Sequence, residues 1–191
     1  VTGYGSDGPG ANRPAFDQVA QAAGGGMSIT GTDQSHPVRA GIPIGDLGGG
    51  MFGVMGVLAA LYERERSGLG QHVDIAMVDC QISMLNYMAT MHFLSGEDPY
   101  PIGNSHFVHV PYNTFTCSDG CIVIAVITDN FWANLKQVVS CPEFDNAKYD
   151  TQPGRWEDKE LINNRLNRIL SENTCQYWLT ELEARRIPCA P

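Results

Sequence analysis

Basic residues are scarce in this sequence of 191 residues. Lys and Arg together number 12 against 21 Asp and Glu, which gives a formal net charge of −9 at neutral pH. The few basic residues form no cluster, so the chain lacks the broad positive surface with which proteins bind nucleic acid or anionic lipid. We therefore expect no nucleic-acid partner, and an anionic ligand would need a small cationic pocket of its own.

Long uninterrupted apolar runs are also missing. A membrane-spanning helix needs ~20 predominantly apolar residues, and no unbroken run approaches that length. The first residues have no basic and apolar leader of the secretory kind. These absences predict a soluble, cytoplasmic protein with no membrane partner. Because the chain starts without Met and stops inside a Pro-containing connection, we expect a piece or a shortened form of a longer protein.

The cysteines lack the spacing of a metal site or of a disulfide framework. A chain of this size can build a core without disulfide staples, so we expect reduced thiols. Cys117 and Cys121 form a lone C-x-x-x-C around a Ser-Asp-Gly turn, and no second Cys or His pair stands at zinc-finger spacing. The sequence therefore predicts no metal site. The six cysteines are irregularly spaced: Cys80, Cys117, Cys121, Cys141, Cys175 and Cys189.

Helical periodicity dominates the chain before residue 95. We expect a short helix at residues 16–23 and a longer one at residues 47–66, which a charged turn and Gly68 bring to an end. Residues 74–94 are apolar on most sides and predict a third helix that is buried or packed between subunits. The composition changes at residues 95–99, Ser-Gly-Glu-Asp-Pro, which is typical of a linker.

The chain after this linker mixes strands with helices. Two β-rich runs, residues 108–116 and 121–127, flank the Ser-Asp-Gly turn and predict a hairpin. Asn173 and Gln176 have the spacing of a capping box at the start of the last helix. Helices are expected at residues 129–139, 156–170 and 176–186.

Asp46 stands at or just before the start of the helix expected at residues 47–66, and spacing alone leaves two interpretations open. Aspartate is a common N-cap, because it accepts hydrogen bonds from the first N–H groups of a helix. The run Gly48–Gly50, however, costs a helix ~1 kcal/mol per residue, which indicates that something approaches this backbone closely. A carboxylate beside bare N–H groups suits covalent catalysis, in which it attacks an acyl group while amides stabilise the oxyanion.

Several motifs occur in fixed order along nearly the whole chain. Together they resemble the central portion of a family III CoA-transferase of the CaiB/BaiF type. This family includes formyl-CoA and carnitine CoA-transferases and, as relatives, α-methylacyl-CoA racemases. The motifs are Thr2-Gly3-Tyr4-Gly5, Phe16-Asp17-Gln18-Val19-Ala20-Gln21, Pro43-Ile44-Gly45-Asp46, Gly68-Leu69-Gly70-Gln71-His72-Val73-Asp74 and Gly103-Asn104-Ser105-His106.

The resemblance implies an acyl-CoA:carboxylate CoA-transferase whose nucleophile is Asp46. In the family, the aspartate of the Gly-Asp motif takes the acyl group from a thioester as a mixed anhydride. It then carries CoA as an aspartyl thioester, from which CoA passes to an acceptor carboxylate. The implied substrates are an acyl-CoA and a carboxylic acid, with no metal and no tightly bound cofactor.

Two further residues bear on the reaction type by the same resemblance. Phe16 stands where the racemase pattern has a histidine base, and phenylalanine cannot accept a proton. The sequence thus favours a transferase over the alternative, a racemase-like enzyme. Asp17 matches a carboxylate that transferases use near the nucleophile, although a role as helix N-cap is equally consistent with its position.

The remaining candidate binding residues are spread along the chain. Gly48 and Gly49 match the region next to the nucleophile. Arg39 is either a partner for phosphate or carboxylate groups or a solvated surface charge. His106 resembles part of a small-domain loop that closes on the acyl group and excludes water.

The resemblance also implies a fold and an assembly. The complete fold is of the α/β class, with a large Rossmann-type domain and a small α+β domain, and two subunits interlock as a homodimer. Residues 1–97 would form the later part of the large domain with its linker helices. Residues 98–191 would form the small domain, truncated at both chain ends. A truncated, non-catalytic remnant that self-associates through exposed apolar surface is the remaining alternative.

Overall fold

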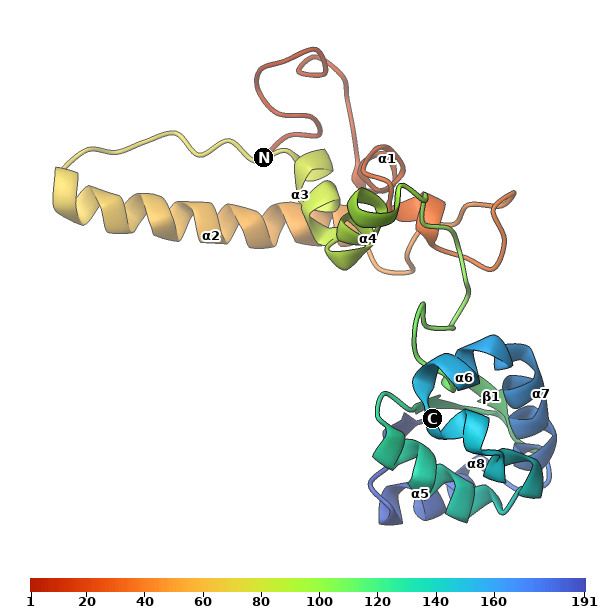
Figure 1. The fold of residues 1–191 in the computed structure, drawn as a ribbon. Coiled ribbons are helices and arrows are strands. Elements are labelled where there is room, and N and C mark those ends of the chain that lie inside the picture. Colours follow the sequence, from red (N-terminus) through yellow and green to blue (C-terminus); the bar gives the residue numbers. More distant parts are fainter. The chain divides into compact units, whose positions relative to one another are not determined.

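The computed structural model describes all 191 residues, and the chain forms two compact units, Val1–Gly103 and Asn104–Pro191 (Figure 1). The first unit is built from helices, whereas the second combines a small antiparallel sheet with helices. The chain is therefore a mixed helix and sheet protein. The assignment of residues 1–97 and 98–191 to the large and small domains of a longer protein stays a prediction.

Four α-helices and one 3-10 turn make up the first unit. The longest helix begins three residues before the position that its spacing indicated and ends at Gly68, whose φ of 74° suits a glycine after a helix. The helices expected at residues 16–23 and 47–66 are confirmed. The elements are α1 (Asp17–Ala23), η1 (Gly26–Ile29), α2 (Ile44–Ser67), α3 (Met77–Met84) and α4 (Tyr87–Ser95).

Glycines let α1 and α3 pack closely on the first turns of α2. A Cβ atom on Gly45 would lie 2.9 Å from a backbone oxygen of α1. A Cβ atom on Gly48 or Gly49 would lie 2.6 or 3.1 Å from methionine side chains of α3. The close approach that the glycine run predicted is therefore made by the neighbouring helices.

The single helix predicted for residues 74–94 is wrong in two respects. Residues 74–76 are not helical, because Thr2 and Ala76 form a parallel β-bridge. The helical segment is then interrupted at Asn86, whose φ of 49° and ψ of −122° lie outside the helical region. Burial is uneven as well, since α4 leaves Phe93 and Leu94 82% and 84% exposed.

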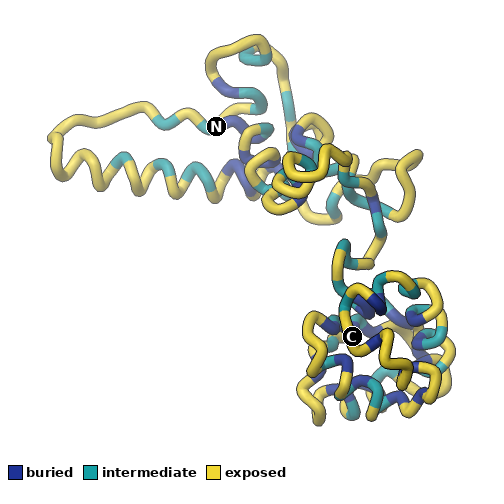
Figure 2. Tube along the Cα trace, viewed as in Figure 1, coloured by how far each residue is buried: buried dark blue, intermediate teal, exposed yellow.

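Most of the length of α2 is uncovered (Figure 2). This 24-residue helix is long and apolar enough to cross a membrane by length and composition, and only 17% of its most apolar stretch is buried. The sequence predicted no such span because glycines and Asp46 interrupt the apolar run. The mean hydropathy over an 18-residue stretch of the helix is nevertheless high enough for a membrane span. A helix that is apolar on most sides is normally covered by protein or lipid, and the first unit itself does not cover α2.

A three-stranded sheet organises the second unit. β1 (Tyr112–Thr116) and β2 (Cys121–Ala125) form the predicted antiparallel hairpin, and β3 (Cys189–Ala190) pairs with the other edge of β2. The remaining elements surround this sheet in the sequence order α5 (Asp129–Val139), η2 (Pro142–Asp145), η3 (Ala147–Asp150), α6 (Gln152–Glu157), α7 (Lys159–Leu170) and α8 (Cys175–Ala184).

Two helix boundaries of the second unit differ from expectation. The helix predicted at residues 156–170 is divided at Asp158 into α6 and α7. The capping box predicted from Asn173 to Gln176 is wrong, because Thr174 is the N-cap of α8 and its hydroxyl accepts a hydrogen bond from the Tyr177 N–H at 3.2 Å. Threonine is itself a good N-cap. The helix begins at Cys175, one residue before the expected start at residue 176.

The main hydrophobic core lies in the second unit, and a buried arginine crosses it. Arg155 is 0% exposed. Its guanidinium donates to the carbonyl oxygens of Val110 and Tyr149 at 2.9 and 2.7 Å and to the Asp129 carboxylate at 2.9 Å. No sequence motif predicted a role for this residue. Arg155 therefore joins the segment before β1 to η3 and α5 through hydrogen bonds.

Candidate active site

The carboxylate of Asp46 is free and exposed at the start of α2. Asp46 is the third residue of this helix, the N-cap position belongs to Pro43, and no side chain caps the helix from that position. The interpretation of Asp46 as the N-cap is therefore wrong. Its side chain has no hydrogen bond or ion pair and lies in the first helical turn, where the positive end of the helix dipole favours a negative charge.

The backbone beside this carboxylate keeps one donor unused. The N–H groups of Ile44 and Leu47 donate to nearby carbonyl oxygens, at 2.8 and 3.0 Å. The Gly45 N–H donates to the carboxylate of Asp17 at 2.7 Å. The N–H of Asp46 has no acceptor. A free carboxylate and a free amide on one residue meet the two needs of acyl-group chemistry, a nucleophile and a donor toward a developing oxyanion.

Asp17 fixes the start of α2 from the neighbouring helix α1. One carboxylate oxygen accepts from the Gly45 N–H, and the other accepts from the side-chain amide of Gln21 at 2.8 Å. The Gln21 carbonyl oxygen accepts in turn from the Ala40 N–H at 2.9 Å. The interpretation of Asp17 as the N-cap of its own helix is wrong, because Phe16 occupies that position. The network instead holds both α2 and the loop before it against α1.

Gln21 is the site residue that sequence reasoning missed. It is 1% exposed and links Asp17 to the loop before α2. The available signal was its spacing, four residues after Asp17, which places the two side chains on the same face of a helix. A buried glutamine at this spacing can donate a hydrogen bond to a nearby carboxylate, as Gln21 does to Asp17.

The other candidate residues of the first unit lie in different surroundings. Phe16 is 81% exposed. Arg39 is exposed, and its guanidinium donates to the carbonyl oxygens of Ala40 and Gly41 at 2.9 and 3.1 Å, so it folds back on its own loop. Gly48 and Gly49 are buried against α3, which accounts for both glycines by helix packing. A role of these residues in binding substrate stays a prediction.

His106 belongs to the second unit, and hydrogen bonds define its tautomer. Its Nδ1 atom accepts from the backbone N–H groups of Val108 and His109, at 3.0 and 3.2 Å. The proton of the neutral ring must therefore be on Nε2. Desolvation by burial, together with the nearby His109 ring, lowers the pKa of His106, which favours the neutral form. Its predicted place over the acyl group stays a prediction.

The cysteines are all free thiols, and no three His, Cys, Asp or Glu side chains come together as ligands for a metal ion. The two cysteines of the C-x-x-x-C motif have separate surroundings. Cys121 is exposed, whereas Cys117 is buried. The reduced, cytoplasmic setting expected for these thiols stays a prediction.

Comparison with known proteins connects this geometry to a family. The model of CoA-transferase family III matches residues 1–191. The chain belongs to this family. Among curated relatives, this family III protein is 35% identical over 179 residues to a succinyl-CoA:mesaconate CoA-transferase of Haloarcula hispanica. The aligned region is 94% of the chain and 45% of the relative. It is 30% identical over 192 residues to the human succinyl-CoA:glutarate CoA-transferase. The aligned region is 100% of the chain and 44% of the relative.

A solved structure gives the same assignment. The family III protein is similar to a CaiB/BaiF family protein from Brucella suis, with a TM-score of 0.86 and 30% identity over 100% of this chain and 50% of that one. The chain spans about half the length of the curated relatives that it matches.

Proposed function

We propose that this family III protein transfers CoA from an acyl thioester to a carboxylic acid, with the Asp46 carboxylate as the nucleophile. The observation that carries the proposal is the unpaired, exposed carboxylate in the first turn of α2. An ordinary surface aspartate would need no such support, yet Asp17 and Gln21 hold this helix start from α1. Rigid support of a reactive group is what positional catalysis requires.

The proposed reaction proceeds through two kinds of covalent intermediate. An Asp46 oxygen attacks the thioester carbonyl, CoA leaves as the thiolate, and a mixed anhydride forms. The thiolate then attacks the Asp46 carbonyl carbon, which releases the first acid and leaves an aspartyl-CoA thioester. The acceptor carboxylate attacks this thioester, CoA leaves again as the thiolate, and a second anhydride forms. The thiolate then attacks the acceptor carbonyl. The new acyl-CoA leaves, and Asp46 is regenerated as a carboxylate.

The names of the relatives support a dicarboxylic acid as the acceptor. They are transferases for mesaconate, glutarate and oxalate, and two of the three take CoA from succinyl-CoA. We extend this class to the present chain, with succinyl-CoA as the first donor to try. Phe16 supports transfer over racemisation, because its ring has no lone pair with which to remove a proton beside a thioester carbonyl.

We also propose that a second copy of the chain covers α2, as a homodimer. The support is the exposed apolar surface of α2, which includes Met51, Val54 and Leu58, each at least 60% exposed. A cavity of about 490 Å³ lies between α2 and residues 73–75 and is lined almost entirely by apolar side chains and glycine. Sedimentation of the wild-type chain and of Val54→Glu tests this, and a monomeric wild type at micromolar concentration would contradict it.

The Rossmann-type large domain and the interlocked arrangement remain proposals of the same kind. The parallel bridge between Thr2 and Ala76 supports the first, because α1 and α2 lie between the two paired segments in the sequence. A strand, a helical crossover and a parallel strand form the repeating unit of such domains.

Trapping of the Asp46 intermediate tests the proposed chemistry directly. The wild-type chain is incubated with succinyl-CoA and then with hydroxylamine, which converts an aspartyl anhydride or thioester into a stable hydroxamate, and its peptides are analysed by mass spectrometry. We expect the modification on the peptide that contains Asp46, none in Asp46→Asn, and full modification in Asp79→Asn, a control that removes another exposed first-turn carboxylate of the first unit. Modification that persists in Asp46→Asn would remove Asp46 from the role of nucleophile. No modification with any thioester would favour the non-catalytic remnant.

A further inference from the structure

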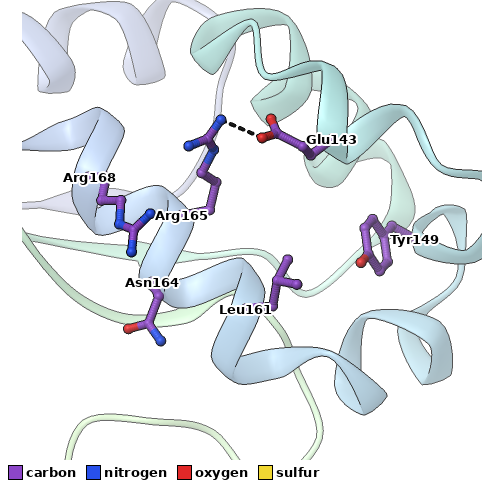
Figure 3. Close-up of a pocket in the computed structure, with 6 residues that line it drawn as sticks. All are labelled: Glu143, Tyr149, Leu161, Asn164, Arg165 and Arg168. Atoms are coloured by element: carbon purple, nitrogen blue, oxygen red, sulfur yellow. Dashed lines mark hydrogen bonds and ion pairs between the residues drawn. The ribbon is translucent and has the colours of Figure 1, made fainter.

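We propose that the second unit carries a binding site for a small organic oxyanion on the exposed side of α7. A cavity of about 420 Å³ lies there, within the range of small-molecule sites. Such a site would not depend on CoA transfer and has no residue in common with the site around Asp46. Its lining comes from η2, η3 and α7 and consists of Glu143, Tyr149, Leu161, Asn164, Arg165 and Arg168 (Figure 3).

The spacing of residues along α7 sets this surface apart from the core. Ile162, Leu166 and Leu170 form the buried side of the helix. The cavity residues of α7 recur at intervals of three and four, which places them together on another side. They are Leu161, Asn164, Arg165 and Arg168.

Arg165 is held in place and still has an unused donor. Its Nη2 atom pairs with the Glu143 carboxylate, as the dashed line in Figure 3 shows. The other Glu143 oxygen accepts from the Cys141 thiol at 2.9 Å. These bonds, that of Cys141 above all, lower the pKa of Glu143 to about 2, so the carboxylate stays charged. The Nε atom of Arg165 is buried and has no acceptor, although a guanidinium carries five N–H donors.

Arg168 adds a second positive charge that has no acidic partner. It lies three residues after Arg165 on the same helix face, where like charges repel each other, and it is exposed. Glu143 balances the charge of Arg165, so Arg168 leaves the cavity with one net positive charge on a chain of net charge −9, and several other cations of this unit are already paired. The paired cations include Lys136 with Asp150, Lys148 with Asp158 and Arg155 with Asp129.

The lining defines the chemical class of the ligand. An oxyanion, either a carboxylate or a phosphate ester, can bridge Arg165 and Arg168, since arginine binds both groups with several N–H donors. Leu161 and the ring of Tyr149 offer apolar contact to a short carbon body. The Tyr149 hydroxyl donates to Asp158 at 2.8 Å, so it is already engaged. The ligand is thus a compact acid with one apolar end.

Calorimetric titration of the whole chain with matched probes tests the site. Benzoate and phenyl phosphate share an apolar body and differ in the anionic group, phenol lacks the charge, and inorganic phosphate lacks the body. We expect benzoate or phenyl phosphate to bind and phenol not to bind. Arg168→Gln should weaken binding about tenfold or more, as expected for a hydrogen bond to a charged group. Arg186→Gln removes an equal charge from an exposed arginine outside the cavity and should change nothing.

Two further variants make the outcome specific. Glu143→Gln removes the carboxylate that competes for Arg165, so it should strengthen binding several-fold. Asp46→Asn, which abolishes the proposed transfer, should leave the affinity unchanged, and this separates the two proposals. No binding of either aromatic anion, an equal effect of the two arginine variants, or weaker binding after Glu143→Gln would overturn the anion site.

Discussion

Replacement of Gly45 by alanine should loosen the contact between α1 and α2 without any change to the Asp46 side chain. The new Cβ atom would lie 2.9 Å from the backbone oxygen of Asp17, 3.0 Å from its carboxylate and 3.3 Å from the Cβ atom of Ala20. Real Cβ atoms do not come this close to backbone, so the helices must separate. Overpacking of this kind costs ~1–3 kcal/mol, and a weakened bond from the Gly45 N–H to Asp17 adds to it.

The opposing effect is the helix propensity of alanine, which exceeds that of glycine by ~1 kcal/mol in a helix interior. Gly45 lies in the first turn of α2, where this gain is smaller, so we expect a net loss of about 2 kcal/mol. Gly50→Ala is the matched control, because Gly50 lies on the same helix with no atom within 4 Å of its would-be Cβ atom. That variant should be neutral or stabilising.

Hydrogen exchange followed by mass spectrometry measures this difference, because local protection reports the opening free energy of the unit concerned. A loss of about 2 kcal/mol corresponds to roughly thirtyfold faster exchange in peptides of α1 and α2. Formation of the hydroxamate on Asp46 should decrease in Gly45→Ala as well. Equal protection in the Gly45 and Gly50 variants would refute the packing that we assign to Gly45.

Three other outcomes are expected in the second unit. Arg155→Met leaves two buried carbonyl oxygens without donors. Each unpaired group costs ~1–3 kcal/mol, so the free energy of unfolding should fall by about 3 kcal/mol, as measured by urea unfolding followed by tryptophan fluorescence. Glu143 has its pKa lowered from 4.5 to about 2, chiefly by the Cys141 thiol. Its contribution to stability is therefore complete above pH 4.5 and is lost as the pH falls toward 2, and Glu143→Gln should remove that part of the acid-unfolding curve. Partial burial raises the pKa of Cys175 to about 12, so iodoacetamide at pH 8 should label the exposed Cys121 well before Cys175, as peptide mass spectrometry can show.

Local sequence patterns predicted the elements whose causes are local. Helical periodicity and a terminal glycine located α2, and the Ser-Asp-Gly turn located the hairpin of β1 and β2. The errors arise where distant residues decide the outcome. Residues 74–76 are extended because of Thr2, more than 70 positions earlier in the sequence, and no periodicity within the segment reports that pairing.

The candidate site shows the same division. Asp46 could be selected from its motif, and its place near the start of a helix followed from the neighbouring pattern. The partner of Asp17 could not be predicted, because the Gly45 N–H is 28 residues away and two roles for the carboxylate were equally consistent with spacing. Arg155 was missed because a long-range set of carbonyl oxygens, rather than any motif, makes its burial favourable.

The helix that carries Asp46 in its first turn is also the helix whose later turns are uncovered. On the proposal that a second copy of the chain covers these turns, association stabilises the helix that holds Asp46, and dilution should lower the proposed activity. Specific activity should rise with protein concentration until all chains are dimeric. Kinetic constants measured at a single low concentration would then underestimate the activity of the dimer.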